Sequence, residues 1–99
     1  MMLSEKLRAL RELSGLPQRK VAAALDIDTA TYCKIENGNY APRKEQVIRL
    51  SEMLASDKND LLKLWLADKF IEVAENDKEN TPEALKIVQE QMKKQNGII

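Results

Sequence analysis

The stretch that decides the fold is LPQRKVAAALDIDTATYCKIENG, residues 16–38. It contains two short segments with apolar residues at helical spacing, on either side of a break at residues 26–28. Asp28 is a good N-cap for the second segment, because its carboxylate can accept the free backbone N–H two or three residues further on. Gly38 ends that segment, since a helix C-terminus commonly needs one residue in the left-handed conformation. Two short helices joined by such a break predict a helix-turn-helix.

The apolar residues of this stretch also follow one register. Counted from Gln18, they stand at places 4, 8, 10, 15 and 18, which are Val21, Leu25, Ile27, Tyr32 and Ile35. Ala22 stands at place 5, where two helix backbones must approach closely. Followed by Glu36-Asn37-Gly38, this pattern resembles the DNA-binding domains of the phage repressor and Cro proteins and of the wider Xre family. The resemblance covers about residues 3–66 and implies a five-helix domain that binds double-stranded DNA.

The chain departs from this family pattern at two positions. Asp26 stands in the turn where the family usually has glycine, and aspartate tolerates a left-handed conformation better than most residues. Pro17 stands where the family often has a Thr or Ser cap. Proline suits the first turn of a helix, because its missing N–H would be unpaired there anyway. The predicted turn therefore remains compatible with both departures.

Charge is distributed unevenly along the 99 residues, which are enough for one domain or a small domain with an appendage. The formal net charge is zero, which alone argues against a nucleic-acid binder. Residues 1–50 hold 9 Lys or Arg and 6 Asp or Glu (9 − 6 = +3), whereas residues 51–99 hold 7 and 10 (7 − 10 = −3). The basic excess lies on the half with the helix-turn-helix, as attraction to phosphate requires, although ordinary surface variation also reaches this size.

Helical spacing continues on both sides of the central stretch, so the predicted fold class is all-α with an aliphatic core. Residues 3–14 form one expected helix, with a possible cap at Ser4, and residues 43–55 form another. The expected stripe of the first helix is Leu3, Leu7, Leu10 and Leu13. Residues 60–76 carry apolar side chains on more than one face, so this fifth helix is expected to bury one surface on the core and another against a partner.

The C-terminal part is predicted to be a helical extension. We expect residues 1–66 to form the DNA-binding domain and residues 67–99 an extension that serves dimerisation. Thr81-Pro82-Glu83 is a typical helix start, and a narrow apolar seam follows it at Leu85, Val88 and Met92. That helix either folds back on the fifth helix or packs across a dimer interface. The last residues, 96–99, are expected to be frayed.

Candidate base-reading residues lie near the start of the second central helix, because a helix in the major groove needs small or short polar side chains there. By position in the repressor pattern they are Thr29, Ala30, Thr31 and Lys34. Thr29 can hydrogen-bond to a base edge, Ala30 can contact a thymine methyl, and Lys34 can reach guanine or a phosphate. Alternatively, the threonines are ordinary first-turn residues and Lys34 is a solvated lysine.

Other polar residues are candidates for contacts with the phosphate backbone, which position a domain without reading sequence. These are Gln18, Arg19, Asn37, Tyr40, Arg43 and Lys44. Glu36 is expected to be structural, because an acidic group beside DNA is costly unless it is paired with an arginine such as Arg11 or with a backbone amide. Cys33 is either a small half-buried residue or a redox-sensitive one.

The common enzyme classes are excluded because the sequence lacks the residues and motifs that they need. The chain has no histidine, one cysteine and three glycines, which leaves no Cys-His nucleophile, no zinc-ligand spacing and no glycine-rich phosphate loop. We therefore expect no enzymatic activity, no cofactor and no metal. No signal peptide and no apolar run near the roughly 20 residues of a membrane span is present, which predicts a cytoplasmic protein without a membrane partner.

Together these observations predict a DNA-binding transcriptional regulator, most simply a repressor, acting as a homodimer on a near-palindromic operator. The expected dimer interface is Leu62, Trp65, Leu66 and Phe70. The segment LLKLWLADKF, residues 61–70, also resembles small Xre-type regulators, some of which accompany restriction–modification systems. The alternative is a protein-interaction or antitoxin-like module that keeps this fold but uses its acidic C-terminal half to bind a protein partner.

Overall fold

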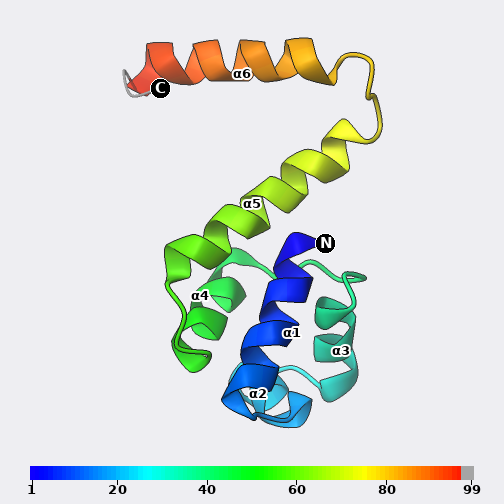
Figure 1. The fold of residues 1–99 in the computed structure, drawn as a ribbon, viewed down its shortest axis with the longest axis vertical. Coiled ribbons are helices and arrows are strands. Elements are labelled where there is room, and N and C mark those ends of the chain that lie inside the picture. Colours follow the sequence, from blue (N-terminus) through cyan, green and yellow to red (C-terminus); the bar gives the residue numbers. More distant parts are fainter. Residues whose placement is uncertain (97–99) are drawn as a thin grey trace. The chain divides into compact units, whose positions relative to one another are not determined.

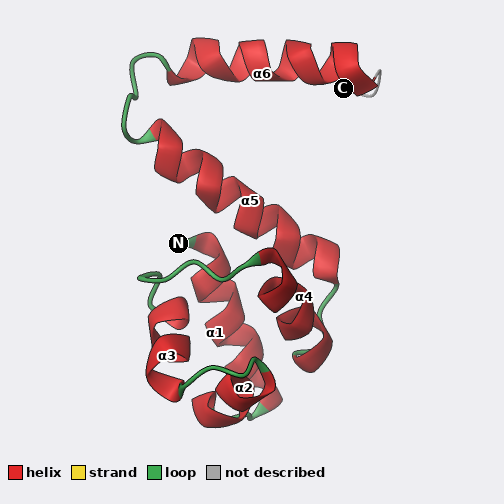
Figure 2. Cartoon of the chain, turned by 180° about the vertical axis from the view of Figure 1, so that it is seen from behind, coloured by secondary structure: helices red, strands yellow, loops and turns green. Residues whose placement is uncertain are grey.

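The computed structural model describes residues 1–96, and all regular structure among them is helical (Figure 2), which confirms the predicted all-α class. The helices are α1 (Met2–Ser14), α2 (Gln18–Ala24), α3 (Thr29–Glu36), α4 (Lys44–Met53), α5 (Lys58–Ala74) and α6 (Thr81–Asn96). The fraying expected at the end concerns mainly residues 97–99, which lie outside the described residues. The chain divides into two compact units, Met1–Asp68 and the part from Lys69 on, and α5 contributes to both.

The first unit encloses an aliphatic core to which α1–α5 all contribute. Figure 1 shows α1 (blue) running between α3 and α4, with α2 at its C-terminal end. The buried apolar residues are Leu3, Leu7, Val21, Ala22, Leu25, Tyr32, Ile35, Val47, Leu50, Leu54 and Leu61. Tyr32 is the only aromatic residue among them, and it is fully buried. Buried residues of α2 and α3 belong to this core, so the core fixes the position of both helices of the central stretch.

One expectation for α1 is wrong. Leu3 and Leu7 are buried and Leu10 packs against the core, but Leu13 is 85% exposed. At about 100° per residue, Leu13 falls roughly 90° from the centre of the stripe that the other three leucines form. The stripe therefore ends one turn before the helix does, and Gly15 closes α1 in the left-handed conformation with φ 70°.

A residue from a distant part of the chain caps the N-terminus of α1. The carboxylate of Asp68 in α5 accepts hydrogen bonds from the backbone N–H groups of Met2 (3.1 Å) and Leu3 (2.9 Å). Asp68 is buried, and these two donors together with the positive end of the helix stabilise its charge. Ser4, the possible cap that the sequence offers, lies inside the first turn, and its hydroxyl donates to the carbonyl of Met1. The Asp68 contact ties α5 to the start of α1.

A second polar contact joins α5 to the loop before α4. The indole Nε1–H of Trp65 donates to the carbonyl oxygen of buried Pro42 at 2.8 Å. In the same loop the backbone N–H of Arg43 donates to the side chain of Gln46 at 2.8 Å, which fixes the start of α4. The indole ring is half-buried and packs against the core. The first half of α5 is thus an integral part of the first unit.

Candidate nucleic-acid interface

The two helices of the central stretch meet at a short turn with the conformation that the sequence predicts. Asp26 has φ 57°, in the left-handed region that aspartate tolerates. Asp28 caps α3, and its carboxylate accepts the backbone N–H of Thr31 at 2.7 Å. Hydrogen bonds from Thr31 lower the pKa of Asp28 below its usual value, so this cap is charged at neutral pH. Gly38 follows the other end of α3 with φ 78°, and both ends of α3 are therefore fixed by local chemistry.

The inner face of α3 carries a buried acid. Glu36 is 3% exposed and lies next to Tyr32 and Ile35, which belong to the core. Its carboxylate accepts hydrogen bonds from Arg11 through Nε and through Nη2, the latter at 3.0 Å. Of the two kinds of partner expected for Glu36, an arginine such as Arg11 or a backbone amide, the structure shows Arg11. The pair joins α1 to the end of α3.

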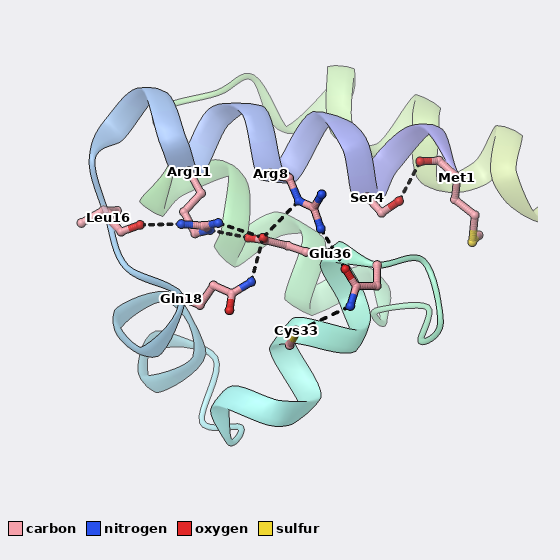
Figure 3. Close-up of polar contacts among 9 residues, drawn as sticks. Met1, Ser4, Arg8, Arg11, Leu16, Gln18, Cys33 and Glu36 are labelled. Atoms are coloured by element: carbon pink, nitrogen blue, oxygen red, sulfur yellow. Dashed lines mark hydrogen bonds and ion pairs between the residues drawn. The ribbon is translucent and has the colours of Figure 1, made fainter.

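Further polar groups converge on the same carboxylate, as Figure 3 shows. The side-chain amide of Gln18, at the start of α2, donates to Glu36 Oε1 at 3.0 Å. Arg11 also donates through Nη1 to the carbonyl of Leu16 at 2.9 Å, which holds the loop between α1 and α2. Arg8 Nε lies 3.8 Å from Glu36 Oε1, and Arg8 Nη2 donates to Asn37 Oδ1 at 2.8 Å. One carboxylate thus connects α1, the start of α2 and the end of α3.

The ionisation of this cluster follows from burial and pairing. Burial favours the neutral acid, but hydrogen bonds from Arg11 and Gln18 and the charge of Arg11 outweigh it, so the pKa of Glu36 lies below its usual value of 4.5. The same contact raises the pKa of Arg11, which stays protonated. Burial, with a smaller contribution from Glu36, raises the pKa of Tyr32. The Tyr32 hydroxyl is buried and makes no hydrogen bond of good geometry within the described residues. At neutral pH the cluster therefore contains charged Glu36 and charged Arg11, with the neutral phenol of Tyr32 beside them.

The outer face of α3 is exposed where the sequence predicts base-reading residues. Thr29 and Ala30, in the first turn, are exposed, and Lys34 one turn further on is exposed as well. Thr31 is half-buried, and its backbone N–H donates to the capping carboxylate of Asp28. These four residues therefore share one short helix, and three of them are accessible to a ligand.

The candidate phosphate contacts fall into two groups. Arg19, Arg43 and Lys44 are exposed, and Tyr40 is 43% exposed. Gln18 and Asn37, by contrast, belong to the polar cluster. Gln18 is half-buried and uses its amide on Glu36, while Asn37 is exposed and donates to the Cys33 sulfur at 3.6 Å as well as accepting from Arg8.

Arg8 and Arg11 have different surroundings, which their positions in the sequence do not reveal. The side chain of Arg11 is 14% exposed and committed to Glu36 and to the Leu16 carbonyl. The side chain of Arg8 is 48% exposed and reaches Asn37 at the end of α3. Arg8 therefore adds a cation beside the end of α3. The sequence signal for both arginines is the same, because Arg8 and Arg11 both lie off the apolar stripe of α1, where they can reach phosphate or form a solvated face.

The four residues expected at a dimer interface are also in different surroundings. Leu62 and Trp65 pack against the core of the first unit. Leu66 and Phe70 are 46% and 52% exposed. The latter two leave the larger apolar surface available to another chain, since Leu62 and Trp65 are partly buried.

Comparison with known families places the chain by its N-terminal two thirds. The profile of a family described as "Helix-turn-helix domain" matches residues 3–64, which include α1 from its second residue on, α2–α4 and the start of α5. No curated protein and no solved structure matches the chain significantly. None of the helices described here is both long enough and apolar enough to cross a membrane. On its sequence, and with α2 and α3 arranged as above, this chain belongs to the helix-turn-helix domain family.

Proposed function

We propose that this protein is a sequence-specific, double-stranded DNA-binding transcriptional regulator of the Xre/Cro type, without enzymatic activity, and that α3 is its recognition helix. The observation that carries the proposal is the division of α3 into two faces. The inner face is fixed by the core and by the Glu36 cluster, whereas the outer face exposes Thr29, Ala30 and Lys34. Small side chains in the first turn allow the backbone to approach base edges in the major groove.

Charge around α3 supports this reading. Arg19 on α2 and Arg43 and Lys44 at the start of α4 are exposed cations, and Arg8 lies beside the end of α3. Contacts of this kind with phosphate hold a domain in register on the duplex and make its affinity depend on salt. Gln18 has a second amide hydrogen that its bond to Glu36 does not use, and we assign it to a phosphate.

We further propose that two copies act together on a near-palindromic operator and that occupation of a promoter represses transcription. In a dimer of this class, the two recognition helices enter successive major grooves on one face of the duplex, about 34 Å apart. The exposed side chains of Leu66 and Phe70 favour a dimer that forms outside the DNA-binding surface.

Replacement of Lys34 by alanine tests the proposed recognition helix. Wild type, Lys34→Ala and the control Lys63→Ala, an exposed lysine on α5, are each used to select binding sites from random duplexes. We expect wild type and the control to enrich one motif. Lys34→Ala should lose discrimination at one position in each half-site, by about 5- to 150-fold, because a good contact to a base edge contributes about 1–3 kcal/mol.

Two results would contradict the proposal. An unchanged motif in Lys34→Ala would mean that Lys34 does not read a base. Absence of any DNA binding by the wild-type protein at low salt would remove the function itself, and the alternative of a protein-interaction module, which the exposed apolar residues of α5 and α6 favour, would replace it.

A further inference from the structure

The loop between α3 and α4 carries several of the candidate phosphate contacts. Residues 39–44 read Asn-Tyr-Ala-Pro-Arg-Lys, with two cations and no acid. The side chains of Arg43 and Lys44 are exposed, and that of Tyr40 is 43% exposed. A flexible loop loses conformational entropy when it binds, so its cations hold a phosphate best where the backbone is already fixed. The contacts that fix this loop therefore bear on DNA binding.

Hydrogen bonds fix the loop at its two ends. At its start, the backbone N–H groups of Asn39 and Tyr40 donate to the carbonyl of Lys34 in α3, at 2.9 and 3.2 Å. At its end, the backbone N–H of Arg43 donates to the side chain of buried Gln46 at 2.8 Å. The path between these two ends runs through Pro42, which has no N–H of its own to donate.

The indole of Trp65 in α5 holds Pro42 in place. Its Nε1–H donates to the Pro42 carbonyl at 2.8 Å. Pro42 is buried and the ring of Trp65 is half-buried against the core, so this bond is partly shielded from water. The indole N–H is a donor only, and a buried carbonyl that loses its donor is costly. The contact thus fixes the backbone directly before Arg43.

Trp65 lies just beyond the part of the chain that matches the domain family. The family profile ends at residue 64, and Trp65 is the one tryptophan of the 99 residues. Asp68, further along α5, bonds to the start of α1 and not to the loop. Trp65 is therefore the point at which α5 adds a contact to the loop from outside the matched region.

We propose that Trp65 is a positioning residue for DNA binding, whose indole holds the loop so that the side chains of Arg43 and Lys44 meet phosphates of the duplex. This inference rests on the proposed function, because it assigns a role within DNA binding. It separates two contributions to that binding. The outer face of α3 reads bases, whereas Trp65 acts through the loop cations and adds affinity without sequence preference.

The expected loss on replacement of Trp65 follows from the salt dependence of phosphate contacts. Each contact adds about −0.9 to the slope of log K against log salt for B-DNA. With about 1 M salt as the reference at which this contribution vanishes, one contact raises the affinity by about 15-fold at about 50 mM and by about 4-fold at about 200 mM. Loss of one contact therefore makes the slope shallower by about 1, and the loss of affinity shrinks as salt rises.

Binding to a labelled pool of random duplexes, measured by fluorescence anisotropy between about 50 and 200 mM salt, tests this role. Trp65→Phe keeps an aromatic ring and removes the N–H, and we expect it to lose about one phosphate contact, with the two fold-changes given above. The control is Leu64→Ala, a neutral change one residue away that removes packing against the core but no side-chain hydrogen bond. The control should keep the wild-type slope, because a smaller folded fraction lowers the affinity by the same factor at both salt concentrations.

A second replacement separates the N–H from the ring. In 3-benzothienylalanine, sulfur takes the place of the indole N–H in a ring of nearly the same shape. The full chain with this residue at position 65 keeps the packing of the ring and loses the bond to Pro42. We expect it to bind the duplexes as Trp65→Phe does, and it replaces Trp65→Phe as the test if the smaller phenyl ring prevents folding.

A double-mutant cycle tests whether Trp65 acts through the loop cations. In an Arg43→Ala/Lys44→Ala background, Trp65→Phe should change the affinity by less than about 2-fold, because the side chains that it positions are absent. An undiminished effect in that background would overturn the inference, since Trp65 would then act through other residues.

Failure of this inference is distinguishable from failure of the proposed function. If wild type binds the duplexes and both replacements at position 65 keep its affinity and its salt slope, the inference is overturned and the function stands. If wild type binds no duplex at about 50 mM salt, the proposed function is removed and the role of Trp65 with it.

Discussion

Replacement of Glu36 by glutamine is the sharpest test of how α3 is held. The side chain of Glu36 is fully buried, that of Arg11 is 14% exposed, and two hydrogen bonds join them. Glutamine has the same shape but no charge, so the guanidinium of Arg11 loses its anion while the core keeps its volume.

The expected loss of stability follows from the burial of the pair. Removing one partner of a buried ion pair costs about 3–5 kcal/mol, because the remaining charge is left uncompensated. The glutamine oxygen still accepts one hydrogen bond and Arg11 reaches solvent in part, so we expect about 2–3 kcal/mol for Glu36→Gln. For a domain of this size the midpoint of thermal unfolding should fall by about 10–20 °C.

The pH dependence of the loss identifies its origin. The folded chain holds the pKa of Glu36 below 4.5, so the folded state binds fewer protons than the unfolded state in this range. Its contribution to the free energy of unfolding is therefore complete above about pH 5 and disappears as the pH falls through the folded pKa. Glutamine does not titrate, so the difference between wild type and Glu36→Gln should shrink below pH 4.5.

Urea unfolding followed by far-UV circular dichroism, between pH 7 and about 3.5, measures both effects. Glu52→Gln, at an exposed position on α4, is the control and should stay within about 0.5 kcal/mol of wild type. A loss below 0.5 kcal/mol for Glu36→Gln at pH 7, or a loss that does not change with pH, would refute the reasoning from a buried charged pair.

Two further substitutions test contacts between α5 and the rest of the first unit. Asp68→Ala removes the acceptor for the N–H groups of Met2 and Leu3, and it should lower the free energy of unfolding in urea by about 1–2 kcal/mol. The control is Glu72→Ala, at an exposed position of α5. A loss for Asp68→Ala no larger than that for the control would argue against the cap. Trp65→Phe removes the 2.8 Å bond to Pro42 and should cost about 1 kcal/mol while leaving the sedimentation behaviour unchanged; a shift towards monomer would return Trp65 to the dimer interface.

Local chemistry explains why the helix-turn-helix was predictable from the sequence. The cap at Asp28, the left-handed turn at Asp26 and the closing Gly38 each depend on neighbours within a few residues, and all three are present. The spacing of Val21 and Ile35 likewise identified core residues on α2 and α3. The cost of an unpaired acid near DNA predicted that Glu36 is paired, either with an arginine such as Arg11 or with a backbone amide, and the structure shows Arg11 as the partner.

Contacts between distant residues were not predictable in the same way. Asp68 interrupts an apolar run in α5, and nothing near it in the sequence points to the N-terminus of α1 as its partner. Gln18 matches a phosphate-binding position of the resembled family, and its bond to Glu36 depends on how α2 and α3 pack. An apolar helix such as α5 has two faces, and its sequence alone does not say that Trp65 turns inward while Phe70 turns outward.

The most direct test of DNA recognition is the binding of wild-type protein to a pool of random duplexes, selected at about 50 and 200 mM salt. The account predicts enrichment of a palindromic motif with half-site centres about one helical turn apart, and an affinity that falls steeply as salt rises. Binding without any enriched motif would reduce the interaction to phosphate contact alone. No binding at the lower salt concentration would contradict the assignment of α3 as a recognition helix.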